Sequence, residues 1–152
     1  MKDLTNEEIT SVLTTVKDGV VAFANGVHPY CIPFGFAYIN GAVYISLFPR
    51  GRKWDYFQKN HLVCFNAFCW NKEHTEWYSV VIDGELEQVT DEASIEAVVR
   101  ANIEKSGLDP AEYLAKRMEY YRSSRDNPKA LKIFKIKPIS ISGRKMHTLI
   151  GS

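Results

Sequence analysis

A basic turn in the middle of the sequence carries the clearest chemistry of the chain. Arg50, Arg52 and Lys53 fall within four residues, and Gly51 separates the two arginines. The turn stands where a strand is expected to enter a helix. Cations oppose a helix at its amino end unless an anion is bound there. Arginine matches phosphate with a fork of donors and lysine with a compact charge, and Ser46 can add a hydroxyl. The turn predicts a phosphate site, with an ordinary cluster of surface charges as the alternative.

The strand that leads into this turn belongs to a predicted hairpin. Asn40-Gly41 is the strongest short hairpin signal, because both residues of such a turn adopt a positive φ. A two-residue turn pairs Ile39 with Ala42 and joins strands at 30–39 and 42–48. Extended along both strands, this register sets Gly35 opposite Ser46 and Phe34 opposite Leu47.

Side chains alternate between the two faces of a strand, so this register sorts the hairpin into two sets. One face has the character of a barrel core and holds Phe34, Phe36, Tyr38, Val43, Ile45 and Leu47. The other face is unusually small and holds Pro33, Gly35, Ala37, Tyr44 and Ser46. Glycine inside a strand often marks the close approach of a ligand or another backbone. We interpret this face as space for a flat ring whose anionic tail reaches the basic turn. The alternative is a face covered by a helix or by a partner subunit.

The elements that must position these residues follow from local patterns. Thr5 and Glu8 have the capping-box spacing of a first helix, and Asp109-Pro110 opens a later one. Helices are expected at 5–19, 52–59, 91–106 and 109–123. Strands are expected at 20–24, 30–39, 42–48, 61–70, 77–89 and 130–142. This order predicts a mainly β (α+β) chain, with six antiparallel strands in a small barrel and helices packed outside it. No repeat or long linker interrupts it, so residues 1–152 are expected to form one domain.

Composition narrows the function. The 152 residues are 45% hydrophobic and 24% charged, which is typical of a globular protein. The formal net charge of +1 argues against nucleic acid or a membrane surface as a partner. The sequence has no apolar run that could span a bilayer and no apolar signal core. Its three cysteines stand at no paired spacing and are expected to be reduced thiols. The chain is therefore expected to be cytoplasmic. No histidine stands at metal-ligand spacing with another histidine or a cysteine, so no metal site is expected.

Taken in order, the motifs of residues 1–90 resemble the flavin-binding split β-barrel family of pyridoxamine 5'-phosphate oxidase-like proteins. The nitroimidazole-resistance-like members are the closer match. The residues that carry the resemblance are His28 to Tyr38, Asn40-Gly41, Val43 to Ser46, Gly51 to Lys53, Asn60 to Phe65 and Tyr78 to Gly84. The resemblance implies a split β-barrel and a homodimer with FMN in clefts at the subunit interface.

The same resemblance assigns roles to particular residues. It places the phosphate-binding pair on Arg52 and Lys53 and the family's hydroxyl on Ser46. The strand alongside the flavin ring falls on Pro33 to Ala37, which includes Phe34, Gly35 and Phe36, and Ser79 matches a polar position that reaches the flavin from a neighbouring strand. His28 and Trp77 are candidates for the rim of the substrate pocket. The arginine-rich carboxy-terminal motif of the oxidases is not matched by Gly143 to His147, which argues against a true pyridoxamine phosphate oxidase.

The resulting hypothesis is an FMN-dependent oxidoreductase that passes electrons from a reduced nicotinamide to a small organic acceptor. The first alternative is a non-catalytic protein that stores or senses flavin or haem on the same fold. A second alternative is a small barrel that binds single-stranded nucleic acid through its aromatic residues, although the near-neutral charge opposes it.

Overall fold

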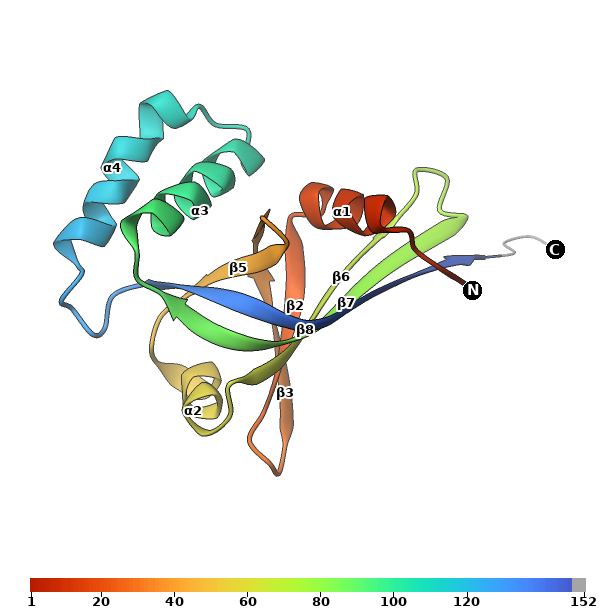
Figure 1. Ribbon diagram of the computed structural model, residues 1–152, viewed down its shortest axis with the longest axis horizontal. Coiled ribbons are helices and arrows are strands. Elements are labelled where there is room, and N and C mark those ends of the chain that lie inside the picture. Colours follow the sequence, from red (N-terminus) through yellow and green to blue (C-terminus); the bar gives the residue numbers. More distant parts are fainter. Residues whose placement is uncertain (149–152) are drawn as a thin grey trace.

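The computed structural model describes residues 1–148 and consists of one continuous antiparallel sheet with four helices around it (Figure 1). The sheet order is β3-β2-β6-β7-β8-β5-β4, and β1 pairs with β8. The strands are β1 (Lys2–Asp3), β2 (Asp18–Ala24), β3 (Pro29–Gly35), β4 (Ala37–Ile39), β5 (Ala42–Leu47), β6 (Leu62–Trp70), β7 (Glu76–Val89) and β8 (Lys132–His147). The helices are α1 (Asn6–Thr15), α2 (Gly51–Lys59), α3 (Glu92–Lys105) and α4 (Pro110–Ser123).

The prediction of a mainly β split barrel with flanking helices is therefore confirmed. The described residues contain eight strands instead of six, because β1 is a short addition and the strand predicted at 30–39 is divided into β3 and β4. The last four residues of the predicted domain, 149–152, lie outside the described residues. No described helix combines the length and the apolar character needed to cross a membrane.

The barrel core is formed by the inward faces of the curled sheet. Its largest fully buried side chains are Phe23, Phe65, Phe134, Ile45, Ile82, Leu86 and Ile136 from the strands and Phe36 from the link between β3 and β4. The rings of Phe36 and Phe65 meet edge to face with their centroids 4.9 Å apart. Burial of so much apolar surface, at about 25 cal/mol per Å², is the main force that holds the barrel together.

The chain changes sheet edge at Phe36, which corrects the predicted length of the hairpin. The pairs Ile39–Ala42, Tyr38–Val43 and Ala37–Tyr44 form as expected. Phe34 and Gly35 instead pair with Gly19 and Asp18 of β2, so they are not opposite Leu47 and Ser46. The backbone leaves one edge strand and joins the other at this residue, and β3 and β5 part on either side of the crossing.

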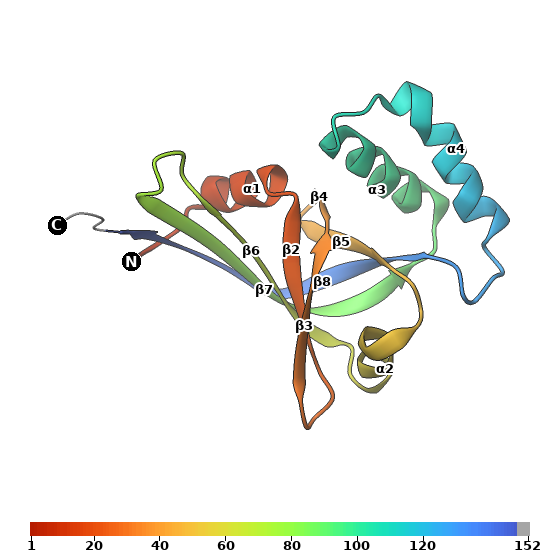
Figure 2. The same ribbon diagram turned by 180° about the vertical axis from the view of Figure 1, so that it is seen from behind.

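Helices cover two different parts of the sheet (Figures 1 and 2). The pair α3–α4 packs over the outer side of β5 and β8 through a second apolar cluster that includes Val99, Ile103, Met118 and Ile133. Helix α1 packs on the long arm formed by β6, β7 and β8. A Cβ on Gly143 of β8 would come within 2.8 Å of the Leu4 side chain, so this glycine permits the close approach of the amino-terminal segment.

Candidate functional site

A cavity of about 600 Å³ opens where β3 and β5 part. It brings together five residues predicted to contact a cofactor, namely Phe34, Gly35, Phe36, Tyr44 and Ser46. The rest of the lining comes from the carboxyl end of α3, with Asn102, Lys105 and Ser106, and from Lys17 and Asp18, where β2 begins. The cavity therefore exists because the strand changes edge at Phe36 and because α3 ends beside that crossing.

Gly35 keeps the mouth of this cavity open. It is exposed in β3, and a Cβ built on it would lie 3.7 Å from its nearest neighbour, the Asp18 carboxylate. A methyl group would fit there, whereas a long side chain would occupy the cavity. The position therefore leaves exposed backbone against which a flat molecule can lie.

Lys105 is the principal charged group on the cavity wall. Its Nζ donates a hydrogen bond of 2.7 Å to the Phe36 carbonyl oxygen and lies 3.7 Å from the centre of the Phe36 ring. Burial lowers the pKa of Lys105, and the nearby Asp18 carboxylate partly offsets that effect. The lysine thus ties the end of α3 to the strand crossing and brings positive charge to the cavity.

The basic turn forms the start of α2, as the sequence predicts. Its N-cap is Arg50, whose side chain makes no capping hydrogen bond, and the first turn contains no acidic residue. Gly51 has a φ of +81°, and a Cβ there would meet nothing within 4 Å. None of the ion pairs formed within residues 1–148 involves Arg50, Arg52 or Lys53. This helix start therefore offers free amides, open space and uncompensated positive charge to an anion.

Arg52 and Lys53 do not line the cavity between β3 and β5. The Arg52 guanidinium lies 4.3 Å from the centre of the Tyr30 ring on β3 and donates to the Tyr56 hydroxyl at 3.2 Å. Tyr30 and Gly35 stand five residues apart on β3, a distance of about 16 Å at 3.3 Å per residue. The cavity and the basic helix start are thus joined along one strand, without forming a single continuous pocket lining.

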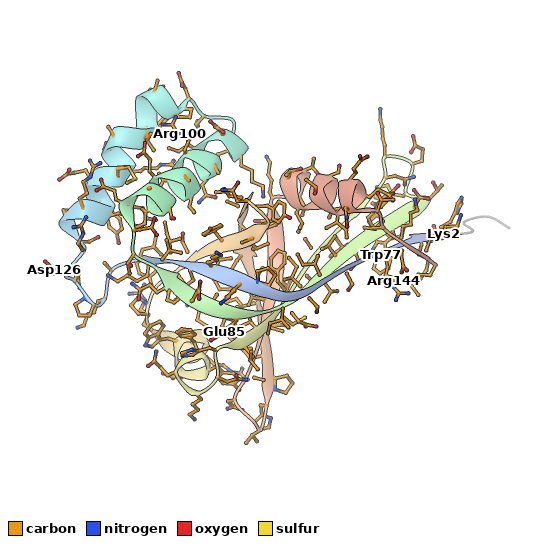
Figure 3. All side chains as sticks on the ribbon, in the orientation of Figure 1. Lys2, Trp77, Glu85, Arg100, Asp126 and Arg144 are labelled. Carbon is orange, nitrogen blue, oxygen red and sulfur yellow. The ribbon has the colours of Figure 1, made fainter. Side chains whose placement is uncertain are left out.

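The other predicted site residues do not line this cavity. Pro33 is exposed on β3, and Ala37 is buried beneath its neighbours. His28 is exposed just before β3, close to the β2–β3 turn. Trp77 lies on the far arm, opposite Trp70 and Met146 (Figure 3). Ser79 accepts a 2.8 Å hydrogen bond from Asn66 on the same arm. Within one chain, His28, Trp77 and Ser79 do not join the cavity lining.

A second cavity of about 320 Å³ adjoins the first and shares Ser46 and Asn102 with it. Its remaining walls include Arg117, Tyr120 and Tyr121 of α4. These α4 residues were not among the predicted site residues. Arg117 and Tyr121 are four residues apart and therefore share one face of the helix. That spacing was the available signal, but the sequence alone does not show that this face meets the outer side of β5.

The shifted pKa values of other titratable groups in the described chain indicate structural roles. Burial raises the pKa of the Cys64 and Cys69 thiols, so neither is an activated nucleophile. A hydrogen bond to the Glu76 carboxylate raises the pKa of Tyr78 to about 12. Within residues 1–148, no group of three or more histidine, cysteine or acidic residues is placed to hold a metal ion.

Comparisons with known proteins agree with this architecture. Residues 5–145 match the family model described as pyridoxamine 5'-phosphate oxidase. No curated protein sequence matches the chain. Among solved structures, an FAD-binding protein from Mesorhizobium loti is 24% identical, with a TM-score of 0.64 over 95% of this chain and 97% of that chain.

Two further solved structures show the same fold. A candidate 5-nitroimidazole antibiotic resistance protein from Bacteroides thetaiotaomicron is 18% identical, with a TM-score of 0.74 over 95% of this chain and 86% of that chain. An FAD- and haem-binding protein from Mycobacterium smegmatis is 15% identical, with a TM-score of 0.69 over 95% of this chain and 73% of that chain.

Proposed function

Because the chain belongs to the pyridoxamine 5'-phosphate oxidase family, we propose that it is a cytoplasmic flavoprotein that binds FMN and acts as an oxidoreductase. Its substrates would be a reduced nicotinamide and a small organic acceptor. The observation that carries the proposal is the cavity between β3 and β5, joined along β3 to an uncompensated basic helix start.

The residues present fit such a cofactor in chemistry. The ring cavity offers aromatic walls at Phe34 and Tyr44, exposed backbone at Gly35 and the hydroxyl of Ser46. A phosphate would be held by the free amides at the start of α2 together with Arg52 and Lys53. The FAD-binding relatives and the family model support a flavin as the occupant.

A flavin held there would supply the redox chemistry, namely the transfer of two electrons between a reduced nicotinamide and a small organic acceptor. This chain's residues bind and orient it. Phe36, buried behind the cavity, and Lys105, bonded to its carbonyl, hold the wall in one position. No dedicated acid or base is needed for such transfers, so the proposal names residues that position the ring and no catalytic residue.

We further propose that the chain forms a homodimer through the bare outer face of the sheet. The exposed large apolar side chains of this face are Leu62, Phe68, Trp70, Ile139 and Met146. Leu62 and Ile139 are 54% and 68% exposed and border an apolar hollow of about 400 Å³. Helix α1 occupies the opposite side of the arm (Figures 1 and 2). Exposed apolar side chains gathered on a face without a covering helix mark an interaction surface. Ser79 and Trp77 stand opposite Phe68 and Trp70 in the sheet and share this face, so a second copy docked there would cover them.

An absorption spectrum of the purified protein tests the cofactor. We expect flavin bands, with FMN identified by mass after denaturation, and bleaching when a reduced nicotinamide is added without oxygen. A colourless protein that stays colourless after incubation with FMN would contradict the proposal. A bound flavin that no nicotinamide reduces would favour a storage or sensing protein. A haem band would favour the haem-binding alternative, as in the relative from Mycobacterium smegmatis.

A further inference from the structure

The second cavity has a built wall that the flavin proposal does not use. Tyr120 and Tyr121 meet edge to face, with ring centroids 5.4 Å apart and planes at 85°. The Tyr120 hydroxyl accepts a 3.0 Å hydrogen bond from the Leu131 amide, which fixes that ring against the start of β8. Burial raises the pKa of the Tyr121 phenol, which lies beside Ser46. Two aromatic side chains are therefore held in place around a space of about 320 Å³.

The same cavity contains a cation with no acidic partner. Arg117 lies on its lining and is exposed, and its guanidinium stands 5.7 Å from the centre of the Tyr113 ring. None of the ion pairs within residues 1–148 involves Arg117, whereas Arg122, one turn further along α4, is paired with Glu92 at 2.6 Å. No acidic residue lines the second cavity. The positive charge of the second cavity therefore suits an anion, and arginine is the side chain best matched to a carboxylate.

The position of this cavity links it to the first. Ser46 and Asn102 belong to both linings, so an occupant of the second cavity would lie beside an occupant of the first. We propose that the second cavity binds a small planar organic anion, with its charged group held by Arg117 and its ring against Tyr120 and Tyr121. That this anion is the substrate rests on the proposed function, because the anion can exchange electrons only if a flavin is bound beside it in the first cavity.

The test compares two ligands that share a ring and differ in charge. Calorimetric titration of the FMN-loaded protein with 4-nitrobenzoate and with 4-nitrobenzyl alcohol should show tighter binding of the anion. Arg117→Gln should weaken the binding of 4-nitrobenzoate by roughly tenfold or more, the value of one hydrogen bond to a charged group. The same variant should leave the affinity for the neutral alcohol unchanged. Lys116→Gln removes an exposed neighbouring charge that does not line the cavity and should change neither affinity.

Three results would overturn the inference. The first is equal affinity for the anion and the alcohol. The second is an Arg117→Gln variant that binds 4-nitrobenzoate as the parent does while keeping the parental Tm. The third is a loss of FAD affinity in Arg117→Gln with FMN and 4-nitrobenzoate unaffected, which would assign the cavity to a dinucleotide tail. Flavin content is read separately from the absorption spectrum. If the protein takes up no flavin, the proposed function fails, and the same titration on the flavin-free protein still decides whether Arg117 holds the anion.

Discussion

The two ends of the sheet differ in how their outer face is covered. At one end, α3 and α4 cover the outer side of β5 and β8 but leave two cavities lined by cations and aromatic rings. At the other end, the outer face of β6, β7 and β8 carries large apolar side chains that no helix of the described chain covers. Covered surface with unfilled polar space is suited to a small ligand, and bare apolar surface to a protein partner. The comparison makes the first end the candidate for ligand binding and the second the candidate for subunit contact.

The largest effect is expected where the ligand end carries its phosphate charge. The double variant Arg52→Gln and Lys53→Gln removes two cations from the start of α2 and should weaken FMN binding by roughly a hundredfold or more, since each hydrogen bond to a charged group contributes about 1.5–3 kcal/mol. Fluorescence titration of the flavin-free protein measures this. Lys59→Gln, in the last turn of the same helix, is the matched control. If the double variant and Lys59→Gln bind FMN equally well, the basic turn is only surface charge.

The next effect concerns the bare face. Phe68 is 52% exposed in the isolated chain, and a glutamate there would bury a charge if two copies meet. Phe68→Glu should raise the dissociation constant of the dimer roughly thirtyfold or more, in line with about 2 kcal/mol for a central interface residue. Sedimentation at several protein concentrations gives that constant. Lys72→Glu, on the exposed loop after β6, serves as the control. If the parent protein is itself monomeric, the bare face is not a subunit contact and the proposed difference between the two ends fails.

A smaller effect is expected from filling the ring cavity. Gly35→Leu places a branched side chain in the mouth and should weaken FMN binding by about tenfold, since overpacking costs about 1–3 kcal/mol. Gly35→Ala should bind normally, because its methyl group would lie 3.7 Å from the nearest atom. Equal binding by the two variants would show that the ring lies elsewhere. The Tm of both should match the parent, because Gly35 is exposed.

The smallest effect is expected at Glu8 of helix α1 on the arm, which belongs to neither proposed site. Hydrogen bonds from the Thr5 backbone and Lys145 lower the pKa of the Glu8 carboxyl below its usual 4.5. A lowered folded pKa gives stability that is present above pH 4.5 and is lost as the pH falls through the lowered value. Glu8→Gln should therefore reduce Tm slightly at pH 7, and the difference from the parent should shrink as the pH falls below 4.5. Glu7→Gln, exposed and outside the ion pairs of residues 1–148, should show no such dependence.

Local signals in the sequence predicted the parts of this fold that depend on local physics. The capping box at Thr5 and Glu8 forms with both hydrogen bonds. The turn at Asn40-Gly41 has the two positive φ values, 49° and 81°, that its residue types require. The resemblance of the first 90 residues led to the correct fold family, and the family model matches residues 5–145.

The parts that were missed depend on contacts between distant segments. The alternation of side chains is the same whether Phe34 and Gly35 pair with β5 or with β2, so the pattern could not show the crossing at Phe36. The same limit hid Lys105, which reaches a carbonyl 69 residues away. Arg117 and Tyr121 likewise share a cavity with Ser46 of β5 only through the packing of α4. The roles of the predicted site residues stay predictions until a ligand is measured.

The pairing of β1 with the last strand has a practical consequence for handling the protein. Lys2 pairs with Lys145 and Asp3 with Arg144, so the amino terminus sits at the tip of the arm beside the end of β8 (Figure 3). A purification tag attached there would stand next to the surface where a second subunit is expected and could mask association. Asp126 lies at the far end of the molecule in the α4–β8 connection. An epitope or dye inserted in that connection would report on assembly without obstructing it.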